Sequence, residues 1–181
     1  INLSLVPLKK IEIVSLEKVG LENRISYYDE IGALKDMVQS HFLSILLKLL
    51  KNSKEALHKF EISLYERAQY GNGIDEGYVK DLGKLSDTET FVKVIGKIGN
   101  IDFEFVTGKK FDQKVSHVSV DDNKIIFNDL ENAYVGLFRD FLSDRRDDFI
   151  NIETSILSWE LIEIIHKKKS RLSYYKEGGK G

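Results

Sequence analysis

The chain contains no cysteine, and none of its apolar runs is long enough to cross a membrane. The first absence excludes disulfides, thiolate chemistry and sulfur-based metal sites. The second excludes an ordinary transmembrane helix, which needs about 18 or more apolar residues in succession. The amino end is also unlike a signal peptide, because Lys9 and Lys10 follow the first apolar residues instead of preceding them. We therefore expect a soluble protein of the cytoplasm that does not bind membranes.

The chain also lacks an excess of charge of either sign, since the formal net charge is only -2 although 31% of the residues are charged. A near-neutral balance leaves no broad basic face, so we expect no nucleic-acid partner. The one basic run, residues 166–169 followed by Arg171, is short and predicts the end of a helix, where cations complement the helix dipole. The 181 residues, 42% of them apolar, can form one domain with a real core.

The first half of the chain alternates between strand and helix signals. Residues 8–17 have the period of a strand. Asp29 is a candidate N-cap for a helix that runs to Leu49, with apolar residues spaced by three and four. Residues 52–70 are ambiguous, with a helix favoured by the spacing of Leu57, Phe60 and Leu64. Residues 70–87, rich in Gly and Asp, predict an exposed loop.

From Thr88 onwards the period changes to two. Four strands are predicted, at 89–99, 101–108, 114–120 and 124–129, with tight turns at Gly99-Asn100 and Asp122-Asn123. Two helical patterns follow, at 130–144 and 152–169. The expected fold class is α+β, with a largely antiparallel sheet and helices gathered on one side.

Two glycine-containing motifs invite comparison with phosphate-binding loops, and both fail. In "GNGIDEG" (71–77) the third glycine comes one place late for a dinucleotide fingerprint, and no helix pattern follows. We interpret the glycines as loop punctuation. "TGKK" (107–110) lacks the upstream glycine of a P-loop. It closes a strand, which would leave Lys109 available to an anion or simply solvated.

His41 is the sharpest candidate for a catalytic residue. A single histidine on an amphipathic helix is usually a packed core residue, whereas a general base needs a carboxylate that orients it. Asp36 lies five residues earlier, about 140° around an α-helix. It is therefore badly placed to orient His41, although it could flank a ligand that His41 also touches.

Longer motifs resemble the glucose-6-phosphate dehydrogenase family. The stretch from Leu16 to Leu43 is similar to its pattern E-x-x-G-x-E-x-R followed by Y-[YF]-D-x-x-G-[AI]-[LI]-R-D-[MV]-x-Q-N-H-L-L. Further matches follow in the family's order: "AQYGNG" (68–73), "SDTETFVKVIGKIGNIDFEFVTGKK" (86–110), "ENAYVGLFRDFLSDRRDDFI" (131–150) and "SWELIEII" (158–165). Together they cover most of the chain.

The resemblance implies that residues 1–181 are the family's C-terminal domain, which binds substrate and forms a homodimer through its sheet. It implies oxidation of glucose 6-phosphate to 6-phosphogluconolactone with NADP⁺, in the pentose phosphate pathway. His41 would be the base, Glu17 and Asp36 would bind the sugar, and Lys109 would reach the substrate. For Glu17 the alternative is an exposed strand end. Arg24 would be a coenzyme or structural contact.

The chain also departs from the family. The family's N-terminal dinucleotide-binding domain is absent from this sequence. That domain carries the aspartate that would orient His41, and it determines the preference for NADP⁺ or NAD⁺. Ser40, Lys35 and Val106 replace the usual Asn, Arg and Arg. The domain is short, so we expect residues to be missing near Pro7 and Asn52 and between Asp121 and Leu130.

Two interpretations of this fragment are open. In the first it is part of an active enzyme and is inactive in isolation. In the second it is a non-catalytic dimerising module derived from the family. A coding region for a nucleotide-binding domain upstream of Ile1 would favour the first.

Overall fold

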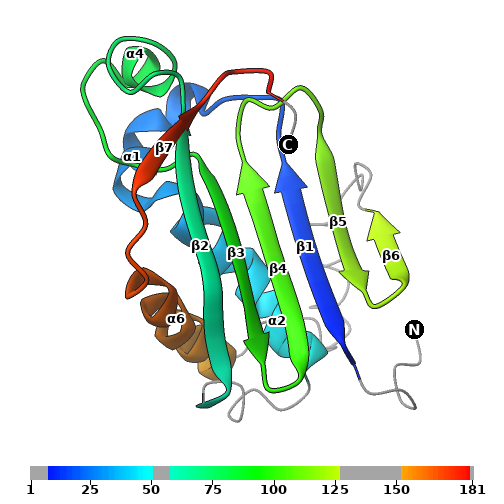
Figure 1. The fold of residues 1–181 in the computed structure, drawn as a ribbon. Coiled ribbons are helices and arrows are strands. Elements are labelled where there is room, and N and C mark those ends of the chain that lie inside the picture. The colour runs from blue at the N-terminus through cyan, green and yellow to red at the C-terminus, as the bar shows by residue number, and fades with distance from the viewer. Residues whose placement is uncertain (1–7, 51–57, 127–151, 180–181) are drawn as a thin grey trace, which may run out of the picture.

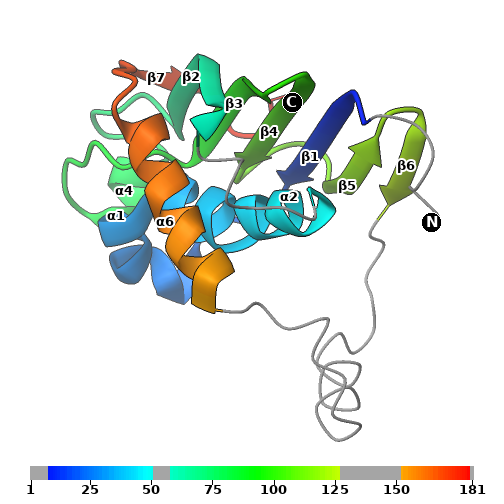
Figure 2. The ribbon, with the colours of Figure 1, turned by 90° about the horizontal axis from the view of Figure 1, so that it is seen from below.

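A seven-stranded sheet with helices on one face makes up the part of the chain that the structure describes (Figures 1 and 2). The computed structural model describes residues 8–50, 58–126 and 152–179. The strand order is β6-β5-β1-β4-β3-β2-β7. The strands are β1 (Lys10–Leu16), β2 (Phe60–Tyr70), β3 (Phe91–Ile98), β4 (Ile101–Gly108), β5 (Val115–Val120), β6 (Asn123–Ile126) and β7 (Leu172–Tyr175). The predicted α+β class with helices on one side is confirmed.

The sheet is largely antiparallel, and two of its strand pairs are parallel. β3 and β4 form a hairpin through Gly99, which adopts a φ of 60°, and β5 and β6 form a second hairpin. The first turn lies where the sequence predicts it, and the second is formed by Asp121 and Asp122, one residue earlier than the predicted Asp122-Asn123. β1 pairs in parallel with β4, and β2 pairs in parallel with β7. Parallel neighbours far apart in sequence leave no local signal, so the sequence did not predict these two pairs.

The predicted helix from Asp29 to Leu49 is in fact a series of helical segments. They are η1 (Glu22–Arg24), α1 (Ile25–Ala33), η2 (Leu34–Phe42) and α2 (Leu43–Leu49). Asp29 is not the N-cap, because α1 already begins at Ile25. Its carboxylate instead accepts hydrogen bonds from Tyr78 and Ser86 and pairs with Lys84 at 3.0 Å. Burial raises the pKa of Asp29, but these hydrogen bonds outweigh it and hold that pKa below its usual value.

The boundary between α1 and η2 is set by Gly32. Its φ of 66° and ψ of 174° interrupt the helix. This backbone region is essentially restricted to glycine. A Cβ atom built on Gly32 would also lie 2.4 Å from Oε1 of Glu89, far inside van der Waals contact. The missing side chain therefore allows both the break in the helix and the close approach of the Glu89 carboxylate.

η2 is a π-helix, in which each N–H bonds the carbonyl five residues earlier. At its end the N–H of Leu43 donates to the carbonyl of Val38. Leu34, Val38 and Phe42 are buried, and Phe42 packs on Phe105 of β4 with ring centroids 5.7 Å apart. The wider turn changes which side chains share a face, so an angle based on α-helical geometry does not apply here.

Residues 60–70 form a strand, and the helix favoured there by the sequence is wrong. Phe60 and Ile62 are buried while Glu61 and Ser63 are exposed, as in a strand. A bulge between Ile62 and Leu64 then shifts the register against β3. One extra residue reverses the phase of the alternation. The segment therefore shows no continuous period of two, and a spacing of four, as between Phe60 and Leu64, fits a helix as well as a strand.

The remaining elements are α4 (Tyr78–Leu82) and α6 (Ile152–His166). The exposed loop predicted at 70–87 is wrong over α4, because Tyr78 and Val79 are buried there. α6 confirms the predicted last helix, and its end at His166 confirms the interpretation of the basic run. β7 was not predicted. The helix expected at 130–144 lies outside the described residues, as do Pro7, Asn52 and residues 127–130. The chain from Asp121 to Ile126 forms the turn and second strand of the β5–β6 hairpin.

One core joins the sheet to η2, α2 and α6. Ile11, Ile13, Phe103 and Phe105 face the helices from the two central strands, and α6 contributes Leu157, Leu161, Ile162 and Ile165. Gln39 of η2 donates to Oγ of Ser158 on α6 at 3.1 Å. No helix among the described residues combines the length and apolar character needed to cross a bilayer.

The contact at Gly32 yields a stability test. We expect Gly32→Ala to lower the free energy of unfolding by about 3 kcal/mol, because it adds backbone strain and steric overlap with Glu89. Gly83→Ala is the matched control, since Gly83 also has positive φ (79°) but nothing within 4 Å of its Cβ position. It should cost about 1 kcal/mol. Equal costs in urea titrations would show that contact with Glu89 is unimportant.

Candidate active site

Glu17 and Lys109 form an ion pair at the edge of the sheet where β1 and β4 end. Nζ of Lys109 lies 2.5 Å from Oε1 of Glu17. The lysine side chain is only 3% exposed and that of the glutamate 26%. Neither residue is therefore the solvated strand end of the alternative interpretation, and the ammonium of Lys109 is paired with the carboxylate of Glu17.

The parallel pairing of β1 and β4 creates this contact. Leu16 lies opposite Gly108 in the register, so the next residues of both strands emerge side by side at one edge. The N–H of Glu17 donates to the carbonyl of Gly108 at 2.9 Å, and the N–H of Phe111 donates to the carbonyl of Glu17 at 2.9 Å. Backbone hydrogen bonds on both sides therefore hold Glu17 beside Lys109, although the two residues are 92 positions apart.

Asp36 and His41 both lie on η2. Because a π-helix bonds residues five apart, side chains five positions apart lie nearly above one another. Asp36 and His41 therefore share a face more closely than the α-helical angle of about 140° suggests. Ser40, next to His41, supports this turn by donating from its hydroxyl to the carbonyl of Lys35 at 2.9 Å.

His41 is exposed, so the alternative that it is a packed core residue is wrong. Asp36 is half-buried. Within the described residues neither side chain makes a hydrogen bond or an ion pair. The imidazole therefore has no carboxylate from this part of the chain to orient it. The structure shows no direct contact between these two residues and the Glu17–Lys109 pair.

Glu89 and Thr90 connect the two halves of the site. The carbonyl of Glu89 accepts the N–H of Ala33 at 3.1 Å, and its Oε1 accepts the N–H of Leu34 at 3.1 Å. The carbonyl of Thr90 accepts the N–H of Lys109 at 3.1 Å. This dipeptide lies within the motif at 86–110, yet no role for it follows from the sequence. The role of Glu89 becomes visible only in the structure, where the positive φ of Gly32 allows the Glu89 carboxylate to approach the start of η2.

Tyr28 lies buried beneath this region with a hydroxyl that has no hydrogen-bond partner among the described residues. Burial, together with the charges of Asp36 and Glu89, raises the pKa of Tyr28 well above its usual value. The phenol therefore stays protonated, and the two charges that act on it come from Asp36 on η2 and from Glu89, which connects the two halves of the site.

The loop after β2 is no phosphate cradle. Gly71 and Gly77 form a β-bridge to each other. Oδ1 of Asn72 accepts the N–H groups of Ile74, Asp75 and Glu76 at 2.9 to 3.1 Å. Backbone donors that could have bound a phosphate are therefore already used, which agrees with the interpretation of these glycines as loop punctuation. Arg24 is exposed in η1.

Comparisons with known proteins agree with the motifs. Residues 6–64 match the family model described as glucose-6-phosphate dehydrogenase, C-terminal domain. The chain is 33% identical over 141 residues to the glucose-6-phosphate 1-dehydrogenase of Rhizobium meliloti, covering 61% of this chain and 29% of that protein. It is 34% identical over 151 residues to the enzyme of the same name from Buchnera aphidicola, covering 65% of this chain and 31% of that protein.

Solved structures show the same fold. A glucose-6-phosphate dehydrogenase in complex with its substrate glucose 6-phosphate superposes with a TM-score of 0.74 at 17% identity, covering 96% of this chain and 53% of that one. The glucose-6-phosphate 1-dehydrogenase of Mycobacterium avium superposes with a TM-score of 0.72 at 19% identity, covering 95% of this chain and 52% of that one. The chain spans about a third or less of the length of the Rhizobium and Buchnera enzymes.

The burial of the ion pair predicts an asymmetry between its two partners. We expect Glu17→Gln to lower the free energy of unfolding by about 3 kcal/mol, because it leaves a buried ammonium uncompensated. Lys109→Met leaves only a partly exposed carboxylate and should cost about 1 kcal/mol.

The exposed pair Lys97–Asp102 serves as a control, because both side chains are more than half exposed. Lys97→Met should change stability by less than about 0.5 kcal/mol. All three variants are compared by urea titration. A Lys109→Met variant less stable than Glu17→Gln would mean that the ammonium is not the costly partner.

Proposed function

Because this chain is a relative of the C-terminal domain of glucose-6-phosphate dehydrogenase, we propose that it is the substrate-binding domain of such an enzyme in the cytoplasm. The full-length protein would oxidise glucose 6-phosphate to 6-phosphogluconolactone with NADP⁺. The observation that carries this proposal is His41 on a π-helix, exposed and without a side-chain partner among the described residues, in a fold whose sheet edge carries the Glu17–Lys109 ion pair. The motif and family-model matches that run through this helix support it.

His41 would act as the general base. When a hydride leaves C1 of the sugar, the hydroxyl on that carbon must lose its proton, and imidazole accepts a proton near neutral pH. An exposed ring that no described side chain engages can reach a bound sugar. The carboxylate that such a base needs would come from outside the described residues, in agreement with an incomplete site.

Asp36 and Glu17 would accept hydrogen bonds from sugar hydroxyls. Asp36 suits this role because its carboxylate is half-buried and makes no hydrogen bond to any described residue. Glu17 keeps one quarter of its side chain exposed, so it can accept a sugar hydroxyl while it holds Lys109. Lys109 is buried, and we propose that it contributes mainly by fixing that carboxylate and by adding positive charge below the substrate.

NADP⁺ would supply the hydride acceptor. The described residues do not fit a dinucleotide: the only glycine-rich loop resembling such a motif within them uses its amides internally. We therefore assign cofactor binding, including the choice of NADP⁺ over NAD⁺, to the part of the enzyme that the curated relatives have beyond this chain. The residues of this chain would bind the sugar and move one proton.

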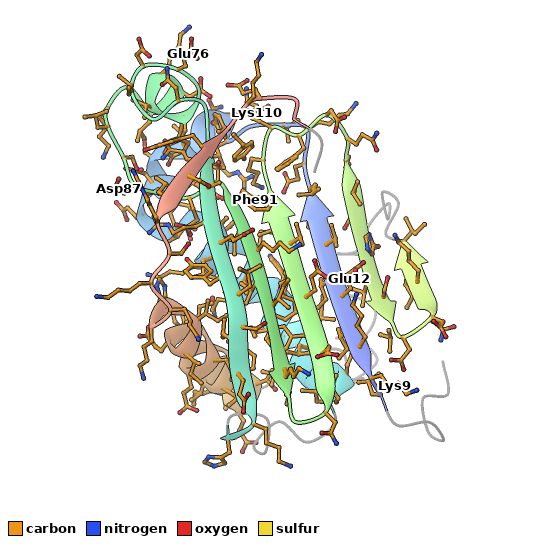
Figure 3. All side chains as sticks on the ribbon, in the orientation of Figure 1. Lys9, Glu12, Glu76, Asp87, Phe91 and Lys110 are labelled. Atoms are coloured by element: carbon orange, nitrogen blue, oxygen red, sulfur yellow. The ribbon has the colours of Figure 1, made fainter. Side chains whose placement is uncertain are left out.

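The face of the sheet that no described helix covers, called the open face below, would form a homodimer. Alternation along the strands places Val14, Ile95 and Val106 opposite the helical layer, and Figure 3 shows Glu12 on that face. Charged side chains there have partners: Lys93 pairs with Glu104 at 2.8 Å, and Oε1 of Glu12 lies within hydrogen-bonding distance of Nε2 of His117, also at 2.8 Å. Paired charges lower the cost of removing water from this face. The same surface would serve the alternative function, a non-catalytic dimerising module.

Substitution of the base separates the two functions. In the full-length protein, we expect His41→Asn to lower kcat for glucose 6-phosphate oxidation by about 10² to 10⁴-fold with little change in substrate binding. His166→Asn, at the exposed end of α6, should leave turnover unchanged. Steady-state formation of NADPH measures both. Near-normal turnover in His41→Asn would remove the catalytic role, and a wild-type protein without turnover would favour the non-catalytic module.

A charged substitution on the open face of the sheet tests the proposed dimer. Ile95→Arg should weaken self-association of the full-length protein by at least about tenfold, because it places an unpaired charge in the interface. Ile156→Arg, on the exposed side of α6 in the opposite layer, is the control. Sedimentation velocity over a concentration series measures the dimer fraction. Equal dimer fractions for the two variants would place the interface elsewhere.

A further inference from the structure

We propose that Glu89 is a positioning residue that fixes helix η2, and with it Asp36 and His41, relative to the strand edge that carries the Glu17–Lys109 pair. This inference rests on the function proposed above, because it concerns the same site. It assigns Glu89 no contact with substrate.

The two oxygens of the Glu89 carboxylate have different partners. Oε1 accepts the N–H of Leu34, the first residue of η2, and Oε2 lies 3.4 Å from the guanidinium of Arg67 on β2. The side chain is only 11% exposed. A carboxylate at a helix N-terminus satisfies an otherwise unpaired N–H and complements the helix dipole. Glu89 therefore ties the start of η2 to the sheet through both charge and hydrogen bonding.

The main chain of the same segment holds the other half of the site. The carbonyl of Glu89 accepts the N–H of Ala33, and the carbonyl of Thr90 accepts the N–H of Lys109. Thr90 is anchored in turn, since its N–H donates to the carbonyl of Ala68 and its Oγ1 accepts the N–H of Tyr70. One dipeptide thus spans from Lys109 to the first residue of the helix that carries the base.

The glycine at position 32 completes this arrangement. The α1 helix is interrupted there, so the orientation of η2 is not inherited from α1. The Glu89 carboxylate occupies the space that a side chain at Gly32 would fill. Since α1 does not continue straight into η2, the Glu89 contacts are the ones that fix where η2 begins.

Arg67 holds the carboxylate from the opposite side. Its guanidinium also donates to the carbonyl of Asp87, two residues before Glu89. The arginine therefore braces both the segment that carries Glu89 and the carboxylate itself. The positioning role belongs to Glu89, because Glu89 is the member of this pair that bonds η2 directly.

The test uses the full-length enzyme and two substitutions at one position. Glu89→Ala removes both contacts of the carboxylate, and kcat/KM for glucose 6-phosphate should fall about 100-fold, since small displacements of catalytic groups cost about that much. Glu89→Gln keeps an oxygen that can accept the N–H of Leu34, so it should recover to within about tenfold of wild type. Asp87→Ala, an exposed carboxylate two residues away, should stay within about twofold.

Hydrogen–deuterium exchange separates positioning from general stability. In Glu89→Ala, amides of residues 34–42 should exchange faster while those of β3 and β4 remain protected. Uniformly faster exchange, or a kcat/KM unchanged for the folded enzyme, would overturn the proposal. A wild-type enzyme inactive on glucose 6-phosphate would refute the proposed function, whereas the exchange pattern would still report on Glu89.

Discussion

The parallel pairing of β1 with β4 is the constraint on which the candidate site depends. It places the carboxyl ends of two central strands at one edge, so that Glu17 and Lys109 meet although 92 residues separate them. Parallel strands cannot be joined by a short turn. The long connection between β1 and β4 includes η2, which carries Asp36 and His41, together with β2 and β3. The strand pairing and the placement of the helix are therefore two results of the same topology.

The two faces of the sheet differ in their interactions: apolar packing dominates the helical face, and ion pairs dominate the other. On the helical face, aromatic residues such as Phe42 and Phe105 fix η2 against β4. On the other face, charged residues are paired within the layer and surround a few half-buried apolar side chains. This division allows one face to position a site while the proposed dimer uses the other. Burial of Lys109 at the edge is acceptable because Glu17 neutralises it.

Local patterns predicted much of this fold, and the reasons for the exceptions are physical. The β3–β4 hairpin was predictable because Gly99 supplies a positive φ between two alternating stretches. β2 was missed because a bulge between Ile62 and Leu64 inverts the alternation. The angle between Asp36 and His41 was misjudged because the α-helical period was assumed, whereas the chain forms a π-helix there. The contribution of Glu89 depends on its contact with Gly32, which lies too far away in the sequence for any local window to contain both.

If this chain provides half of a site that oxidises C1 of glucose 6-phosphate, the hydride must come from that carbon. The most direct measurement supplies the full-length protein with glucose 6-phosphate deuterated at C1 and NADP⁺, followed by mass analysis of the cofactor. We expect NADPH to form and to carry the deuterium, because the proposed reaction moves the hydride from C1 to the cofactor while the hydroxyl on that carbon loses its proton. A correctly folded protein that forms no NADPH, or forms NADPH without the label, would contradict the proposed function.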